Sequence, residues 1–180
     1  MDAAPMDASS EQRLTWLNAL PAARAVAELL RCCGARRWAE AMAARRPFAS
    51  LQALQQAASE VWWALERADW LEAFAAHPRI GDLQRLRERF AGRGGSWSEG
   101  EQAGVQGAPE ALLQELMAGN REYERRFGHI FIVCASGRTA AELLQALRAR
   151  LANDPETELR LAAAEQDRIT RLRLEKLLQP

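Results

Sequence analysis

The chain has 180 residues, 48% of them hydrophobic and 27% charged, and its 24 basic side chains balance its 24 acidic ones. This length predicts one domain with a substantial core, and the balanced charge argues against partners that need a strong overall field, such as nucleic acid or an anionic membrane. No apolar run approaches the roughly 18 residues needed to cross a bilayer, and the opening stretch MDAAPMDASS lacks the pattern of a signal peptide. We therefore expect a cytoplasmic protein that binds neither nucleic acid nor a membrane.

The first half of the chain predicts a series of short helices. LTWLNAL belongs to one, and the next begins at Pro21 and stops at Gly34. RRPFAS is a connector, and Ser50 is placed to cap a helix whose apolar positions keep helical spacing. A shorter helix follows Asp69 and ends at His77, because a residue before proline is pushed out of the α region.

The middle of the chain mixes helix signals with a flexible loop. Residues 83–90 predict a helix, and AGRGGSWS predicts the loop after it. Two further helices are expected, one from near Ser98 and one from near Pro109. HIFIVCAS is the one β-like run, and its length does not distinguish a buried strand from a buried helical segment.

The last part of the chain predicts two more helices. Thr139 and Glu142 form a capping box for one, and Asp154 precedes Pro155 at the start of the longest. The inward stripe of this last helix is expected to contain Ile169, Leu172 and Leu177. The pattern as a whole predicts an all-α, multi-helix bundle in one domain from residue 14 to residue 178, after a flexible N-terminus of residues 1–13.

The aromatic and thiol side chains are interpreted mainly as structural. Most of the six tryptophans, at positions 16, 38, 62, 63, 70 and 97, are expected to fill the core. Cys32, Cys33 and Cys134 have neither zinc-ligand nor redox-pair spacing and are expected to be core or near-surface thiols.

The stretch AAHPRIGDLQ places one of the two histidines of the chain, His77, at a helix end. An imidazole with an unperturbed pKa of about 6.5 can act as an acid or a base near neutral pH. The residues alone leave two interpretations open, a structural histidine at a turn and a catalytic one.

A second candidate stretch is SWSEGEQAGV, in which Ser98 and Glu101 fit a capping box. A helix start of this kind also presents unpaired N–H groups that suit a carboxylate or an anionic imide, and Gln102 adds a neutral donor and acceptor. Both interpretations remain open for these residues.

The third stretch, FGHIFIVCASGRT, fits a core segment followed by a helix cap, with His129 at its boundary. His77, Asp82, Glu101 and His129 show no established ligand spacing, so we expect no metal site.

Several ordered blocks carry a resemblance over most of the chain, from about Leu14 to Leu178. They are RRPF, HPRIGD, SEGEQAGV, NREYERRFGHIFIVCASGRT, RLAND and ELRLAAAEQDRITRLRLEKL. In these blocks the chain resembles the 2-oxo-4-hydroxy-4-carboxy-5-ureidoimidazoline (OHCU) decarboxylases. The resemblance implies an all-helical homodimer without metal or organic cofactor. It also implies a carboxy-lyase that decarboxylates OHCU to (S)-allantoin and carbon dioxide, the last step from urate to allantoin in purine degradation.

The resemblance also implies roles for particular residues. His77 matches the catalytic histidine, as proton donor or as the group that polarises the substrate hydroxyl, and Glu101 matches the glutamate that assists it. Arg173 most resembles an arginine of the last helix that faces the site, and Arg171, two residues before it, is the alternative. The segment 131–135 would offer backbone groups to the ring amides of the substrate. The substrate-binding residues implied are Pro78, Ser98, Gln102, Phe131, Ile132, Val133, Cys134, Ala135 and Arg173.

The same residues are consistent with two functions other than decarboxylation. One is a hydrolase acting on a related ureide, with His77 activating water. The other is a non-catalytic helical module that binds a partner in the groove around His77.

Overall fold

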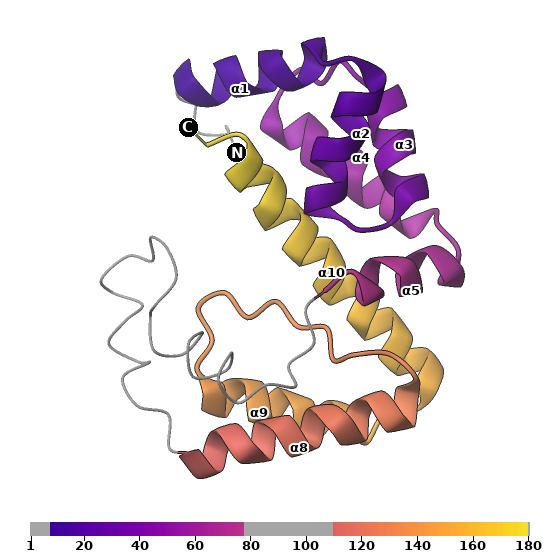
Figure 1. The fold of residues 1–180 in the computed structure, drawn as a ribbon, viewed down its shortest axis with the longest axis vertical. Coiled ribbons are helices and arrows are strands. Elements are labelled where there is room, and N and C mark those ends of the chain that lie inside the picture. The colour runs from indigo at the N-terminus through magenta and orange to yellow at the C-terminus, as the bar shows by residue number, and fades with distance from the viewer. Residues whose placement is uncertain (1–7, 78–109, 180) are drawn as a thin grey trace. The chain divides into compact units, whose positions relative to one another are not determined.

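The computed structural model describes residues 8–77 and 110–179, and these contain eight helices and no strand. The chain divides into two compact units, one of residues 1–76 and 163–180 and the other of residues 77–162. Figure 1 labels the helices along the chain. They are α1 (Ala8–Ala19), α2 (Ala22–Cys32), α3 (Arg36–Ala44), α4 (Leu51–Trp63), α5 (Arg67–Ala75), α8 (Glu110–Phe127), α9 (Ala140–Arg150) and α10 (Pro155–Leu177).

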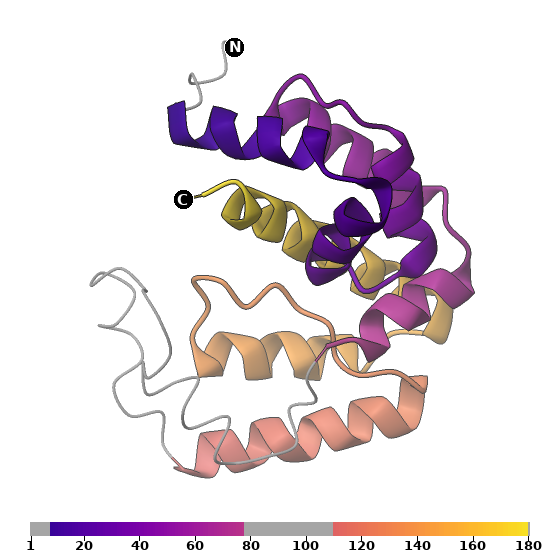
Figure 2. The same ribbon diagram turned by 45° about the horizontal axis from the view of Figure 1, so that its top comes forward.

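The first unit contains α1 to α5 and the C-terminal part of α10, coloured indigo to magenta and yellow in Figures 1 and 2. Helix α3 packs against α2, α4 and α5. Two buried indoles connect helices by donating to backbone carbonyls, Trp38 to Ala58 at 3.0 Å and Trp62 to Ala163 at 2.9 Å. The largest buried side chains of this unit are Leu17, Leu29, Trp38, Met42, Leu54, Trp62, Phe74, Leu174 and Leu178.

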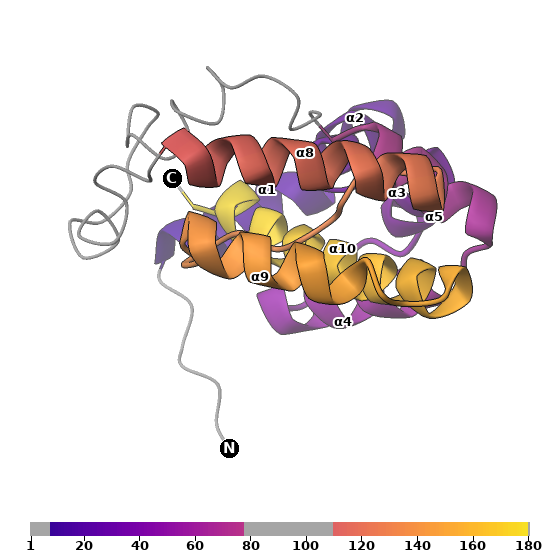
Figure 3. The same ribbon diagram turned by 90° about the horizontal axis from the view of Figure 1, so that it is seen from below.

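The second unit contains α8, α9 and the start of α10, and Figure 3 shows α8 and α9 side by side. Gly119 permits their close approach, because a Cβ at this position would lie 2.6 Å from Cδ2 of Leu147. Residues 128–139 connect the two helices without forming helix or strand. The buried core of this unit is formed by Leu113, Leu116, Tyr123, Phe131, Ala140, Leu143, Leu144 and Leu147.

Local capping signals explain several helix starts and confirm the predictions made from them. Ser50 Oγ accepts from the backbone N–H of Ala53 at 3.1 Å at the start of α4. Thr139 and Glu142 form the expected capping box of α9. The carboxylate of Asp154 accepts from two backbone N–H groups in the first turn of α10. The helix expected from near Pro109 is α8.

Other sequence-based predictions were wrong in detail. Helix α3 was not predicted, because its N-cap, Ala35, has no capping side chain. Helix α5 begins at Arg67, and Asp69 lies inside it as the third residue of a capping box with Glu66. The run HIFIVCAS is neither strand nor helix. Helix α1, which contains most of the predicted helical stretch LTWLNAL, begins at Ala8.

Burial also differs from expectation. The predicted stripe of α10, formed by Ile169, Leu172 and Leu177, is half-buried. The fully buried positions of α10 in the first unit are instead Ala163, Gln166, Thr170 and Leu174. Of the five tryptophans in the described residues, two are buried, two are half-buried and Trp63 is 45% exposed, so most of them do not fill the core.

The helices predicted over residues 83–90 and from near Ser98 lie outside the described residues. In the part of the chain that is described, none of the helices combines the length and the apolar character that a membrane span requires.

Candidate active site

The predicted site residues fall into three groups. Pro78, Ser98, Glu101 and Gln102 lie outside the described residues. His77 and the segment 131–135 belong to the second unit, and Arg173 belongs to the first. Each of the described groups is held by its own contacts.

His77 follows Ala76, the C-cap of α5, and is half-buried. The helix is anchored in the first unit by the buried side chains of Ala73 and Phe74. Its Glu72 carboxylate accepts from the backbone N–H of Arg36, the first residue of α3, at 3.3 Å. A carboxylate at a helix N-terminus is stabilised by the unpaired N–H groups there.

Two further contacts fix α5. The carboxylate of Asp69, which is 8% exposed, accepts from Arg37 at 3.2 Å. Gly34 packs against the C-terminal end of the helix, and a Cβ on Gly34 would collide with Cβ of Ala76. The residue that precedes His77 therefore has no room to shift toward the α2–α3 connector.

The segment 131–135 lies shortly after α8, which ends at Phe127 and is followed by Gly128. Gly128 has φ +75°, a conformation that favours glycine, and its N–H closes the last turn on Glu124 O at 2.9 Å. The His129 ring is buried and meets the Tyr123 ring edge-on, with centroids 5.5 Å apart. Phe131 meets Tyr123 in the same manner at 5.1 Å. Aromatic contacts thus hold the start of the segment on α8.

A buried ion pair holds the next residue of the segment. Arg150, at the end of α9, donates from Nη1 to the backbone carbonyl of Ile132 at 2.7 Å. It also donates from Nε to Glu158 Oε1 at 2.7 Å. The Arg150 side chain is 12% exposed and that of Glu158 is fully buried.

Glu158 has two further partners in the second unit. Tyr123 donates its hydroxyl hydrogen to Oε1, and Asn153 donates to Oε2 at 2.8 Å. Burial raises the pKa of Tyr123 well above its usual range, so this hydroxyl remains a donor throughout the physiological pH range. Both carboxylate oxygens are therefore hydrogen-bonded, as a buried charge requires.

The segment changes from buried to half-buried along its length. Phe131 and Ile132 are 5% and 2% exposed, whereas Val133, Cys134 and Ala135 are half-buried. The carbonyl of Ala135 accepts from the N–H of Arg138 in a turn at 3.2 Å. Non-helical backbone of this kind can present amide and carbonyl groups to a ligand.

Sequence reasoning assigned no role to Arg150 or Glu158. The signal that could have found them is the placement of Arg150, Asn153 and Glu158 around the predicted start of α10 at Asp154. At these positions a charged pair of opposite sign can meet across a helix-to-helix turn.

Arg173 lies against the C-terminus of α2. It is half-buried and donates to the backbone carbonyl of Cys32 at 3.3 Å, whereas Arg171 is exposed. A cation at a helix C-terminus interacts favourably with the helix dipole. Cys32 and Cys33 are free and buried, as predicted, and burial raises their pKa values to about 12 and about 11. These thiols are therefore poor nucleophiles.

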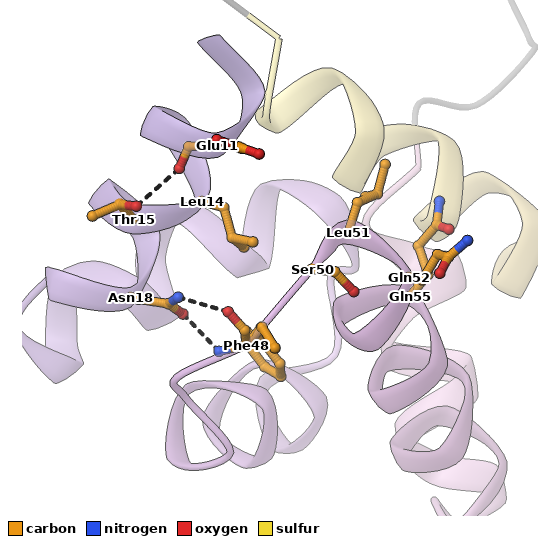
Figure 4. A pocket seen from close by; sticks show the side chains of 10 residues that line it. Glu11, Leu14, Thr15, Asn18, Phe48, Ser50, Leu51, Gln52 and Gln55 are labelled. Carbon is orange, nitrogen blue, oxygen red and sulfur yellow. Dashed lines mark hydrogen bonds between the residues drawn. The ribbon is translucent and has the colours of Figure 1, made fainter. Parts of the chain in front are cut away.

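A pocket of about 670 Å³ lies in the first unit, and it contains none of the predicted site residues. Figure 4 shows lining residues of α1 and of the start of α4 around this pocket, with Asn18 bound to the backbone N–H and carbonyl of Phe48. Glu11 is the one charged side chain of this lining. In the described residues, no three His, Cys, Asp or Glu side chains are grouped as metal ligands would be.

Comparison with known proteins adds to this geometry. The sequence profile described as OHCU decarboxylase matches residues 18–175. The chain is 44% identical over 149 residues to the uric acid degradation bifunctional protein TTL of Arabidopsis thaliana, covering 81% of this chain and 45% of that protein. It is 31% identical over 136 residues to the 2-oxo-4-hydroxy-4-carboxy-5-ureidoimidazoline decarboxylase of Amia calva, covering 74% of this chain and 75% of that one.

The fold has a counterpart among solved structures. A crystal structure of OHCU decarboxylase in the presence of (S)-allantoin matches with a TM-score of 0.69 and 38% identity, covering 84% of this chain and 96% of that chain. The predicted all-α fold is thus confirmed. The chain spans less than half the length of the Arabidopsis thaliana protein. Because the family profile matches most of its residues, the chain belongs to the OHCU decarboxylase family.

Proposed function

We propose that this protein decarboxylates 2-oxo-4-hydroxy-4-carboxy-5-ureidoimidazoline to (S)-allantoin and carbon dioxide. The observation that carries the proposal is the family match over residues 18–175. Two relatives support it by their names, since the Amia calva protein is a decarboxylase of this substrate and the similar crystal structure was solved with (S)-allantoin.

The reaction sets a simple chemical requirement. The bond between the ring carbon and its carboxylate breaks, carbon dioxide leaves, and the electron pair stays on the ring carbon. A proton must then reach that carbon from one face, since one face gives one enantiomer. The protein therefore needs a fixed proton donor and groups that stabilise the transient negative charge.

We assign the proton transfer to His77. It follows the C-cap of α5, and contacts with Arg36 of α3 and with Gly34 hold the end of that helix in place. An imidazole can serve as an acid or as a base in a proton transfer. We assign the assisting role to Glu101, which acts through His77 or through the substrate.

The remaining predicted residues are proposed to bind the substrate. Ser98 and Gln102 offer side-chain hydrogen bonds to the substrate, and Arg173 attracts its negative charge. Pro78 lines the substrate-binding site, which is distinct from the pocket described above. The segment 131–135 pairs its backbone groups with the ring amides. Val133, Cys134 and Ala135 are half-buried and lie outside any helix or strand, which supports this last assignment.

The proposal extends to the catalytic domain, the oligomeric state, the location and the cofactor requirement of the protein. We infer that residues 14–178 work as one catalytic domain, that the protein acts as a homodimer in the cytoplasm, and that it uses no cofactor or metal. Sedimentation analysis of the purified chain tests the dimer, and a chelator added to the assay tests the metal. A monomeric active enzyme or a chelator-sensitive one would contradict the corresponding statement.

The test of the activity starts from urate. The unstable substrate is generated in situ, and circular dichroism follows the allantoin formed by the wild type and by His77→Ala. We expect one enantiomer to appear rapidly with the wild type and slow racemic product with the variant. Slow racemic product from both proteins would contradict the proposed function and favour a binding module, while product formed without release of carbon dioxide would favour a hydrolase.

Glu101→Gln separates a chemical role from a structural one. Glutamine keeps the geometry of a capping box and removes the charge. We expect the far-ultraviolet circular dichroism of this variant to match the wild type and its turnover to fall. Full activity would reduce Glu101 to a capping residue.

A further inference from the structure

The backbone carbonyl of Ile132 receives an unusual donor. Residues 129–138 form neither helix nor strand, so apart from the turn bond from Arg138 to Ala135 their backbone groups need partners outside a regular ladder of hydrogen bonds. At Ile132 the partner is the guanidinium of Arg150, 18 residues later in the chain, at 2.7 Å. This contact lies directly before the half-buried backbone of Val133 to Ala135.

The Arg150 guanidinium is itself held from several directions. Nε and Nη2 lie 2.7 Å and 2.5 Å from Glu158 Oε1, and the charged group lies 4.7 Å from the centroid of the Phe131 ring. A planar guanidinium presents its donors in a fixed fork, so binding to Glu158 determines where Nη1 points. A lysine ammonium has no such fork and does not transmit this geometry.

Stability alone is a weak reason for such an arrangement. Desolvation of a buried ion pair offsets most of its attraction, and apolar residues of similar volume often stabilise a protein equally well. A buried pair does fix one conformation where its hydrogen bonds demand it. Here the group whose position it fixes is the Ile132 carbonyl, at the edge of the backbone that the proposed function assigns to the substrate ring.

We infer that Arg150, oriented by Glu158, is a positioning residue that sets the backbone of residues 131–135 for binding of the substrate ring. The inference rests on the proposed function for its substrate. It assigns no contact between Arg150 and the substrate. Its consequence is that loss of the guanidinium fork weakens binding while the chemical step at His77 continues.

The experiment compares Arg150→Lys with two controls. Arg148 lies on α9, as Arg150 does, and forms an exposed ion pair with Glu115 of α8, so Arg148→Lys makes the same change outside the buried pair. Tyr123→Phe removes two hydrogen bonds of the Tyr123 hydroxyl, the one that it donates to Glu158 and the one that it accepts from Arg150 Nη2, and keeps the bond from Arg150 Nη1 to Ile132. For each protein, steady-state kinetics give KM and kcat, and hydrogen exchange read by mass spectrometry reports on the amides of residues 130–135.

For Arg150→Lys we expect KM to rise about tenfold with kcat within about twofold, and amide exchange in the segment to quicken about tenfold. Both controls should keep the wild-type KM. A folded Arg150→Lys with wild-type KM overturns the inference, even where exchange quickens. A rise of KM in Tyr123→Phe as large as in Arg150→Lys also overturns it, because destabilisation would then explain both.

Two further outcomes are covered. Should Arg150→Lys fail to fold, the double variant Arg150→Gln/Glu158→Gln removes both buried charges together, and the same rise in KM is expected of it. Should the wild type form no (S)-allantoin, the proposed function fails, and exchange in the segment then decides whether Arg150 sets its backbone. If Arg150→Lys then exchanges the amides of residues 130–135 at the wild-type rate, the inference is overturned as well.

Discussion

The two compact units differ in how they hold the backbone between their helices. In the first unit the connectors are short, and buried indoles of Trp38 and Trp62 donate to carbonyls of neighbouring helices. In the second unit residues 128–139 form a long connector, and a buried ion pair of Arg150 and Glu158 holds its middle. Packed helices pair their own backbone groups, whereas irregular backbone needs partners brought from elsewhere.

The difference bears on where chemistry can lie. A helix exposes few backbone hydrogen-bonding groups to a ligand, because its N–H and C=O groups are already paired along its axis. The connector of the second unit has such groups and is held rigidly enough to use them. This comparison leads to three predictions about stability, from the largest expected effect to the smallest.

The largest effect is expected from Glu158→Ala. This change leaves the Arg150 charge buried without its partner and removes the acceptor used by Tyr123 and Asn153. We expect the free energy of unfolding to fall by about 3–5 kcal/mol, measured by urea denaturation. Glu158→Gln keeps a hydrogen-bond acceptor at this position and should lower the free energy of unfolding by less. A loss below about 1 kcal/mol would mean that the buried ion pair contributes little to holding the second unit.

A smaller effect is expected in the first unit from Gly34→Ala. The added Cβ would collide with Cβ of Ala76 at the end of α5, so the helix end must move. We expect a loss of about 1–3 kcal/mol in the free energy of unfolding. The double variant Gly34→Ala/Ala76→Gly removes the opposing methyl group and should recover most of that loss. If the double variant recovers none of the lost free energy of unfolding, the collision with Ala76 is not the cause of that loss.

The smallest effect concerns the exposed capping box at the start of α9. Hydrogen bonds from the backbone and hydroxyl of Thr139 hold the pKa of Glu142 below its ordinary value of 4.5. A carboxyl whose pKa is lowered on folding adds stability above its unfolded pKa and loses it as the pH falls through the folded one. The stability difference between wild type and Glu142→Gln should therefore be constant above about pH 5 and shrink below pH 4.5. A difference that grows on acidification would refute this linkage.

Local signals carried much of the helical structure. Ser50, Thr139 and Asp154 were identified as helix starts from neighbouring residues alone, and all three accept from backbone N–H groups as expected. Capping depends on contacts within a few residues, so a sequence window contains the whole interaction. The helix α3 lacks such a side chain at Ala35, although Trp38, Ala39, Met42 and Ala43 keep the spacing of a buried helical face.

Burial was harder to predict, because it depends on what packs against each face. On α10 the small and polar residues Ala163, Gln166 and Thr170 are buried, and the larger Ile169 and Leu172 are only half-buried. Gln166 donates to Thr170 at 3.2 Å, which satisfies both polar groups inside the core. A pattern based on hydrophobicity alone does not contain this pairing.

The candidate site also combines features that a local stretch of sequence predicts with contacts that only helix packing creates. The ordered family blocks indicate the family, and the proline after His77 predicts a helix end near this histidine, which lies two residues after the last residue of α5. The placement of Ile132 against Arg150, and of Gly34 against Ala76, joins residues far apart in sequence. Such contacts depend on how helices pack and on which buried backbone group is left without a helical partner, and neither is a property of any short stretch of sequence.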